Sequence, residues 1–440
     1  MTSRPTNLAE SVFRIAGRLR VDAKRTVTER VGTQAWYPYY AGYAGAFVRE
    51  LLAGLGDFGA LSVLDPWNGS GTTSSIAHRL GHVAYGFDIN PVLSVVSAAK
   101  LAHPDDALHV TGLAKRLARV PVRLSAVHDP LRAWLALSTV AQYRAIESEL
   151  LNELACTRTG KALAPGRDAL PPLAAFLLLA LIRTAREFAS VKRGSNPTWT
   201  RPSDDRRRSG RTFGARWVEQ VSAMADDLKN EMGETPRRAW NGELGIADSR
   251  ALPLGSGDID LVLTSPPYCT RIDYIVSASF ELAALGMGSS SSEFQGLRRV
   301  SMGTPLSRSC ELASIPSEWP GSVRDVLDKI REHPSKASES YYYRTYWQYF
   351  EDAMNSLLEL RRVIRPLGAA VLVVQSSYYK EVAIDLPELY VDFARALGFR
   401  AQVASSVEVR RAMSQINPHS RKHMADKHYR EGVVVLERTA

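Results

Sequence analysis

Short apolar runs alternate with amphipathic stretches along much of the chain, and this alternation predicts an α/β protein. Apolar residues fill 61–64 and 83–87, whereas the residues between them, 72–80, have the spacing of a helix. Short apolar runs bounded by turn residues are typical of buried strands. The segment therefore predicts a β-loop-α-β unit, whose two parallel strands imply a right-handed crossover.

Strand-like runs return in the second half of the chain. The stretches 245–248, 259–263, 369–374 and 432–437 predict further strands, and helical spacing covers 44–55, 343–364 and 385–397. The last of these helices is followed by Gly398, a common signal for the end of a helix. We therefore expect one sheet whose strands come from both ends of the chain.

Two segments interrupt this alternation. The pattern from 101 to 240 is helical, with apolar residues three to four apart at 131–154 and 173–188 and a polar, basic loop at 192–216. The segment 286–340 is rich in Ser, Gly and Pro, so we expect it to be loop-rich and partly mobile. The chain then divides into an N-terminal segment with the first half of the sheet (1–100), a helical insertion (101–240) and the second half of the sheet (241–440).

Composition limits the class of protein. The 440 residues are 45% hydrophobic, enough for a large core, and the net charge of +9 favours a polyanionic partner such as nucleic acid. Cys156, Cys269 and Cys310 form no CxxC pair, so neither a disulfide framework nor a metal site is expected. The first 30 residues lack the apolar core of a signal peptide, and the longest apolar stretch, 169–182, is too short to span a bilayer. We expect a cytoplasmic, nucleoid-associated protein with no membrane contact.

The first strand leads into a glycine loop at 65–73, Asp-Pro-Trp-Asn-Gly-Ser-Gly-Thr-Thr. Its glycines allow the backbone to approach a ligand closely. Its hydroxyl side chains lie at the start of the next helix, where unpaired N–H groups favour an acidic group such as the carboxylate of a methionine moiety. A phosphate loop is not indicated, because no Lys follows the last glycine.

Two acidic residues end other strands. Asp88 follows the strand after the glycine loop, where a carboxylate can accept both hydroxyl groups of a ribose, and Asp248 could accept a hydrogen bond from an adenine amino group. Each residue has a structural alternative. Asp88 could cap a helix that begins near Pro91, and Asp248 could serve only in a turn.

The strand at 259–263 leads into Thr-Ser-Pro-Pro-Tyr at 264–268. We expect this segment and the glycine loop at the carboxyl edge of one parallel sheet, where such sheets bind ligands. The prolines fix an extended backbone whose carbonyl groups, with the Ser265 hydroxyl, can accept hydrogen bonds from an exocyclic amine. Tyr268 could stack on a flipped base; a structural turn is the alternative. Cys269 is expected to be structural, because attack by an amine needs no thiolate.

The glycine loop resembles the DPFxGSGTT cofactor motif of bacterial DNA amino-methyltransferases, and 264–268 looks like their catalytic motif. The Ser-Pro-Pro form resembles the N4-cytosine branch, whereas Asp-Pro-Pro or Asn-Pro-Pro is commoner among N6-adenine enzymes. The resemblance implies a Rossmann-like S-adenosylmethionine-dependent methyltransferase sheet, in which Trp67 replaces the usual Phe. The aromatic segment 36–40 lies where such enzymes can place a further cofactor-contacting motif.

The resemblance, joined to the residues above, gives a set of expected site residues. The catalytic residues are Ser265, Pro266, Pro267 and Tyr268. The residues expected to bind S-adenosyl-L-methionine are Asp65, Pro66, Trp67, Gly69, Ser70, Gly71, Thr72, Thr73, Asp88, Asn90 and Asp248. The residues expected to contact DNA are Arg193, Asn196, Trp199 and Arg206, Arg207 and Arg208 in the insertion, with Arg271, Asp273 and Tyr274 lining the pocket for the flipped base. A solvated loop and a structural ion pair are the alternatives for these two groups.

The function that this resemblance implies is methylation of cytosine N4 at a specific site in duplex DNA, with the target base flipped out. A cognate restriction endonuclease is a possible partner. Methylation of adenine N6 and methylation of an RNA or tRNA base remain alternatives, as does a non-catalytic nucleic-acid-binding protein with a Rossmann-like shell. No nuclease signature occurs, so we do not expect this chain to cleave DNA.

Overall fold

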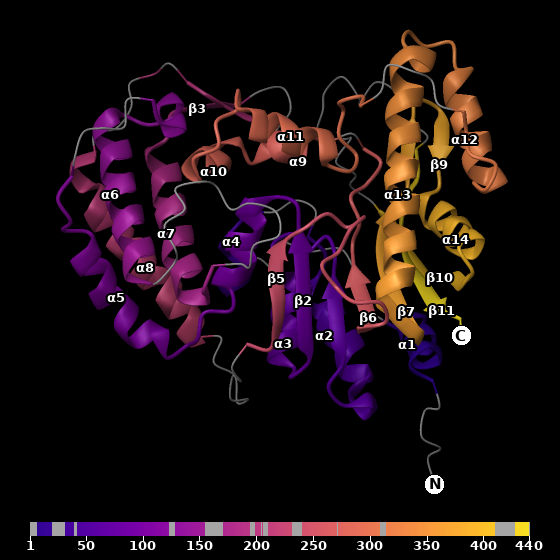
Figure 1. The fold of residues 1–440 in the computed structure, drawn as a ribbon, viewed down its shortest axis with the longest axis horizontal. Coiled ribbons are helices and arrows are strands. Elements are labelled where there is room, and N and C mark those ends of the chain that lie inside the picture. The colour runs from indigo at the N-terminus through magenta and orange to yellow at the C-terminus, as the bar shows by residue number, and fades with distance from the viewer. Residues whose placement is uncertain are drawn as a thin grey trace.

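The computed structural model describes residues 7–19, 31–38, 42–122, 128–154, 170–193, 199–203, 205, 210–230, 240–270, 272–308, 314–409 and 427–439. Its centre is one seven-stranded sheet (Figure 1). The strands are β1 (Ser62–Asp65), β2 (Val83–Asp88), β5 (Gly242–Ile246), β6 (Ile259–Thr264), β7 (Ile364–Gln375), β10 (Phe399–Val409) and β11 (Tyr429–Arg438). The order is β10-β11-β7-β6-β1-β2-β5, and only the β11 pairings are antiparallel. The mostly parallel sheet confirms the predicted α/β fold class.

The direction in which the chain adds strands reverses between β1 and β6. Strands β2 and β5 follow β1 on one side, whereas β6 and β7 continue on the other. Because β1 and β6 are parallel neighbours, with Val63 opposite Leu261, both end at the same edge. This edge is where ligands bind in doubly wound sheets. The glycine loop and the Thr-Ser-Pro-Pro-Tyr segment therefore leave the sheet side by side, as predicted.

Helices cover both faces of the sheet. Helices α1 (Leu8–Ala16), α2 (Gly45–Gly54) and α3 (Thr72–Arg79) pack on one face, and α12 (Gly321–Arg331), α13 (Tyr343–Val363) and α14 (Leu386–Ala396) pack on the other. Alternate strand residues serve the two cores: Val63 joins the first cluster and Leu64 the second. Burial on both faces explains why these strands have continuous apolar runs.

The segment between β2 and β5 is mainly helical. Helix α4 (Pro91–Ala99) is followed by α5 (Asp106–Leu117), α6 (Leu137–Glu153), α7 (Pro172–Phe188) and α8 (Phe213–Asn230), which stand beside the sheet at the left of Figure 1. Their shared core includes Phe176 and Trp217. The prediction of a loop at 192–216 is wrong in part, because β3 (Val191–Arg193) and β4 (Thr200–Pro202) pair as a hairpin.

The segment 286–340 also differs from its expectation. Short helices α9 (Tyr274–Ser277) and α10 (Ser279–Ala284) precede it, and it contains α11 (Ser292–Val300), α12 and a π-helical turn (Ser338–Tyr342). Val323, Leu327 and Ile330 form a buried stripe on α12, which the surrounding Ser and Gly residues obscured.

The remaining elements are small. Strands β8 (Ser377–Tyr379) and β9 (Val382–Ile384) form a hairpin, and 3-10 turns lie at Gly32–Ala35, Gly56–Phe58, Pro130–Ala133 and Gly210–Thr212. Within the described ranges, no helix is long and apolar enough to cross a membrane.

Candidate active site

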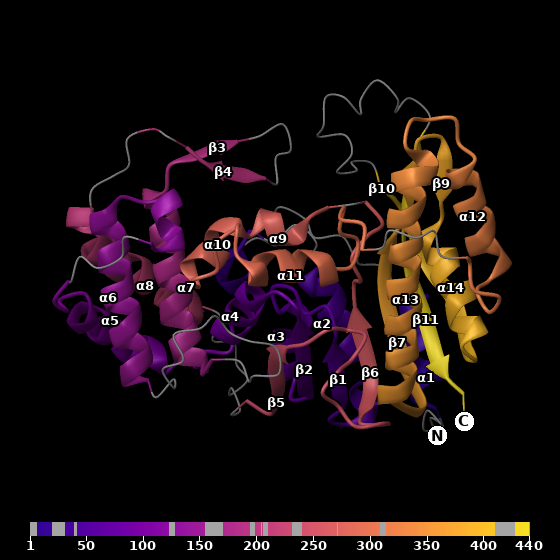
Figure 2. The same cartoon turned by 45° about the horizontal axis from the view of Figure 1, so that its top comes forward.

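A cleft lies at the carboxyl edge of the sheet and is lined in part by residues of α9, α10 and α11. These three helices lie over that edge of the sheet in Figure 2. It contains about 1350 Å³ of space without atoms, part of it open to solvent. The predicted residues that line it are Pro66, Trp67, Asp88, Asn90, Asp248, Ser265, Pro267 and Tyr274. The other polar lining residues include Tyr37, Arg186, Thr200, Ser249, Arg250 and Glu281. Residues from both predicted motifs therefore face one space.

The glycine loop turns the chain from β1 into α3. Gly69 and Gly71 have φ angles of 50° and 76°, the left-handed region that favours glycine. A Cβ at Gly71 would also lie 2.6 Å from the Ser97 Cβ. Ser70, Thr72 and Thr73 are buried and do not line the cleft, and the Ser70 hydroxyl has no hydrogen-bond partner. The glycine loop therefore contributes its backbone conformation to the site, and the buried Ser70 hydroxyl has no hydrogen-bond partner.

Asp65 joins three elements at the base of the site. Its carboxylate accepts hydrogen bonds from the Thr73 hydroxyl (2.7 Å), the Thr264 hydroxyl (2.5 Å) and the Trp67 amide (3.2 Å). Burial raises the pKa of this carboxyl group to about 6, while the two hydroxyl groups act in the opposite direction. Asp65 does not line the cleft. It ties the end of β1 to α3 and to the end of β6.

Asp88 faces the cleft and is held by backbone groups. The Gly69 amide donates to its Oδ2 (3.0 Å) and the Asn90 amide donates to its Oδ1 (2.9 Å). Burial raises its pKa to about 6. Asn90 caps α4, because its Oδ1 accepts from the Val92 amide (3.0 Å). The helix cap is therefore Asn90, and each Asp88 oxygen keeps a second lone pair for a ligand.

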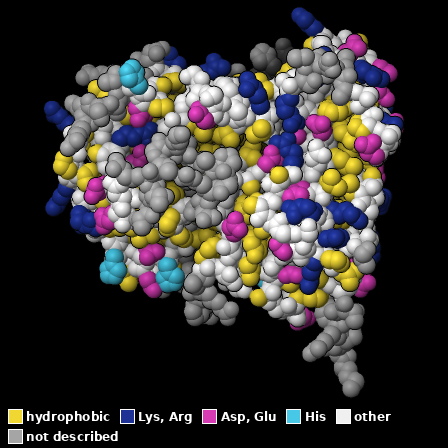
Figure 3. Space-filling model, viewed as in Figure 1, with side chains coloured by type: hydrophobic (Ala, Val, Ile, Leu, Met, Phe, Trp, Pro, Cys, Tyr) yellow, Lys and Arg dark blue, Asp and Glu magenta, His cyan; other side chains and the backbone are white. Residues whose placement is uncertain are grey.

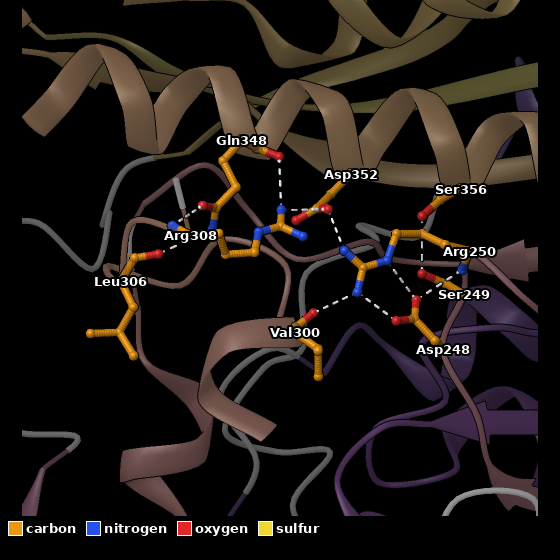
Figure 4. A network of polar contacts seen from close by, with 9 residues as sticks. All are labelled: Asp248, Ser249, Arg250, Val300, Leu306, Arg308, Gln348, Asp352 and Ser356. Carbon is orange, nitrogen blue, oxygen red and sulfur yellow. Dashed lines mark hydrogen bonds and ion pairs between the residues drawn. The ribbon is translucent and has the colours of Figure 1, made fainter. Parts of the chain in front are cut away.

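Asp248 belongs to a polar network (Figure 4). Arg250 donates to both of its carboxylate oxygens, at 2.8 and 2.5 Å, and also contacts the buried Asp352. Arg308 pairs with Asp352 at 2.7 Å. Asp248 thus has the structural role in a turn that was the alternative, and it also lines the cleft. Its carboxylate charge is already neutralised by Arg250.

The Thr-Ser-Pro-Pro-Tyr segment is fixed on both sides. The Ser265 hydroxyl donates to the Val373 carbonyl (2.9 Å), and the Tyr349 hydroxyl donates to the Pro267 carbonyl (2.9 Å). The Tyr268 hydroxyl donates to Glu431 (3.3 Å), and burial with the nearby Glu431 charge raises the Tyr268 pKa. Ser265 and Pro267 line the cleft, whereas Pro266 and Tyr268 do not. Cys269 packs in the core between β6 and α13.

The residues expected to contact DNA are only partly described. Asn196, Arg206, Arg207, Arg208 and Arg271 lie outside the described residues, as does the side chain of Arg193. Trp199 is half-buried, and its indole nitrogen has no hydrogen-bond partner. Asp273 caps α9 and pairs with Arg298 at 2.8 Å, which matches the structural alternative. Tyr274 lines the cleft, and burial raises its pKa to about 12.

Several lining residues were not predicted. Arg186 on α7, Thr200 on β4 and Glu281 on α10 come from helical or hairpin segments without a recognisable motif. Tyr37 lies in the aromatic segment that was expected to contain a cofactor contact, but no single residue there could be assigned. Tertiary packing alone brings these four residues together.

The strand order and the cleft define a Rossmann-like α/β protein with a cleft at its switch point. No protein-family model matches the chain. The chain is 24% identical over 280 residues to the Type II methyltransferase M.BsoBI of Geobacillus stearothermophilus, over 57% of this chain and 52% of that protein. It therefore spans about half the length of this curated relative. Among solved structures, the rRNA methyltransferase aviRa from Streptomyces viridochromogenes aligns over 94% of this chain and 96% of that one, with 12% identity and a TM-score of 0.30. That score is too low to support an argument.

Proposed function

We propose that the protein is an S-adenosylmethionine-dependent DNA methyltransferase that methylates the exocyclic N4 of cytosine in duplex DNA. The observation that carries the proposal is the junction of the two motifs. Asp65 and Thr264, 199 positions apart, are hydrogen-bonded, and this contact holds the end of β1 beside the end of β6. Asp88, at the end of β2, and Ser265, directly after β6, line the same cleft. The similarity to a Type II methyltransferase supports both the chemistry and a role in restriction-modification.

The residues present fit the proposed cofactor. Asp88 lines the cleft and keeps a second lone pair on each carboxylate oxygen for the ribose hydroxyl groups. Trp67 and Pro66 contribute apolar surface to the cleft, and Asp248 is the proposed acceptor of a hydrogen bond from the adenine amino group. When bound, S-adenosylmethionine supplies an electrophilic methyl group.

The chain's own residues would position the nucleophile. The amino group of cytosine is a weak nucleophile because its lone pair is delocalised into the ring. Ser265 and the following backbone would hold its two hydrogens, which favours a tetrahedral nitrogen and directs the lone pair. Tyr268 is proposed to stack on the flipped base, offsetting about 1–3 kcal/mol of the cost of unstacking.

Duplex DNA is the proposed partner. The net charge of +9 favours a polyanion. On the face drawn in Figure 3, basic and acidic side chains are interspersed. The proposed DNA contacts therefore remain the insertion residues Arg193, Asn196, Trp199 and Arg206 to Arg208, together with Arg271.

The test is a product assay. Purified protein is incubated with labelled S-adenosylmethionine and mixed-sequence duplex DNA, and the digested nucleosides are identified by mass spectrometry. We expect N4-methylcytosine, and we expect Ser265→Ala to abolish most of it while cofactor binding is retained. N6-methyladenine as the sole product would overturn the cytosine assignment. Methylation of transcripts but not of duplex DNA would indicate an RNA enzyme.

A further inference from the structure

The cleft has a second polar wall, formed by the helical side of the molecule. Arg186 donates from Nη1 to Glu281 Oε1 (3.3 Å) and from Nη2 to the Thr200 hydroxyl (3.2 Å). The Arg186 guanidinium also lies 5.0 Å from the centre of the Phe280 ring. The neighbouring segments α7 and β4 and the distant helix α10 therefore hold one arginine and one glutamate against the cleft.

Glu281 is the unusual member of this wall. Its side chain lines the cleft although the residue is only 8% exposed, and its Oε2 is buried without a hydrogen-bond partner. Burial raises the pKa of Glu281, and Arg186 acts in the opposite direction. A buried carboxylate oxygen without a donor is unfavourable, so a ligand that supplies a donor there gains affinity.

Tyr37 also lines this cleft. The Tyr37 pKa is raised by burial and by the charges of Glu281 and Asp88, while Arg186 lowers it. The charges of Glu281, Arg186 and Asp88 therefore all act on one phenol group of the cleft lining. Glu281 and Arg186 therefore belong to the same cleft lining as Asp88, the proposed acceptor of the ribose hydroxyl groups.

We propose that Glu281 and Arg186 bind the amino-acid end of S-adenosylmethionine: Glu281 Oε2 accepts a hydrogen bond from its ammonium group, and Arg186 faces its carboxylate. This inference rests on the proposed function. An ammonium group supplies the missing donor together with a compensating charge, whereas a neutral hydroxyl supplies only the donor. A side-by-side anion and cation match the two charges of an amino acid.

Two ligands that differ in this group test the proposal. S-adenosylhomocysteine has the amino-acid end, whereas methylthioadenosine has the same nucleoside and sulfur without it. We expect wild-type protein to bind S-adenosylhomocysteine more tightly in calorimetry. We expect Glu281→Gln to weaken S-adenosylhomocysteine by about ten- to hundredfold, the usual range for a hydrogen bond to a charged group, and to leave methylthioadenosine unchanged.

A matched control is available in the helical segment. Glu147 is partly buried and also paired with an arginine, Arg144 at 2.7 Å, but it does not line the cleft, so Glu147→Gln should bind both ligands normally. Equal weakening of both ligands by Glu281→Gln, with normal thermal unfolding, would show that Glu281 contacts the nucleoside and would overturn the inference. No change in either ligand would overturn it too. If wild-type protein binds neither ligand, the proposed function fails and the inference fails with it.

Discussion

The two walls of the cleft are built in opposite ways. On the strand edge, both Asp88 oxygens are held by backbone amides and both Asp65 oxygens by neighbouring side-chain or backbone donors. On the helical wall, Glu281 depends on Arg186, which is 95 positions away, and keeps one oxygen without a partner. The strand edge is thus organised before any ligand arrives, whereas the helical wall has a group that a ligand must satisfy. Substitutions at the two walls should therefore have different effects.

The largest effect is expected for Asp65→Ala, on stability. The substitution leaves the Thr264 hydroxyl and the Trp67 amide without their acceptor, and it leaves the Thr73 hydroxyl with the Leu263 carbonyl (3.1 Å) as its acceptor, so we expect the free energy of unfolding to fall by about 3 kcal/mol. Chemical denaturation measures this change, with the exposed Asp57→Ala as the control. Unchanged stability with loss of cofactor binding would mean that Asp65 acts on the ligand instead, as the sequence expectation had it.

The contrast between the walls also explains what the sequence revealed of the fold. Strands β1, β2 and β6 were predicted because burial on both faces makes them continuously apolar. Strand β10 was not predicted because much of it is exposed and polar. Helix α1 was not predicted because the first 30 residues were considered only as a possible signal peptide. Helix α12 was hidden by its Ser- and Gly-rich surroundings.

The candidate site follows the same division. Asp88, Asn90 and Ser265 line the cleft because each lies at the end of a strand or within two residues of it, so position in the sequence fixes position at the edge. Arg186 and Glu281 lie in largely buried helices whose sequences contain no recognisable motif. Only the packing of α7 against α10 makes them neighbours, and no local pattern encodes that contact.

The next effect in size is expected for Asp88→Asn, on affinity. An amide has one acceptor oxygen in place of two and would turn an N–H group toward the Gly69 or Asn90 amide. We expect S-adenosylhomocysteine to bind about thirtyfold more weakly, roughly 2 kcal/mol, while turnover at saturating cofactor stays within a few-fold of wild type. Calorimetry and steady-state kinetics separate the two. A loss confined to turnover would contradict the assignment of Asp88 to the ribose.

The smallest expected effect is a pH dependence of nucleoside binding. The Asp88 pKa of about 6 lies above the ordinary 3.8, so acidification protonates the group that should accept the ribose hydroxyl groups. Methylthioadenosine, which lacks the group assigned to Glu281, should bind roughly fourfold more weakly at about pH 5.5 than at about pH 7. The weaker binding at low pH would not be caused by unfolding. The folded-state pKa values of Asp65 and Asp88 are raised, so the contribution of these groups to stability is present at low pH and lost as pH rises through about 6. Asp88→Asn should bind weakly at both pH values with a flat profile. If the affinity of Asp88→Asn for methylthioadenosine changes with pH as in the wild type, another group titrates. The assignment of Asp88 to the ribose would then lose its main electrostatic support.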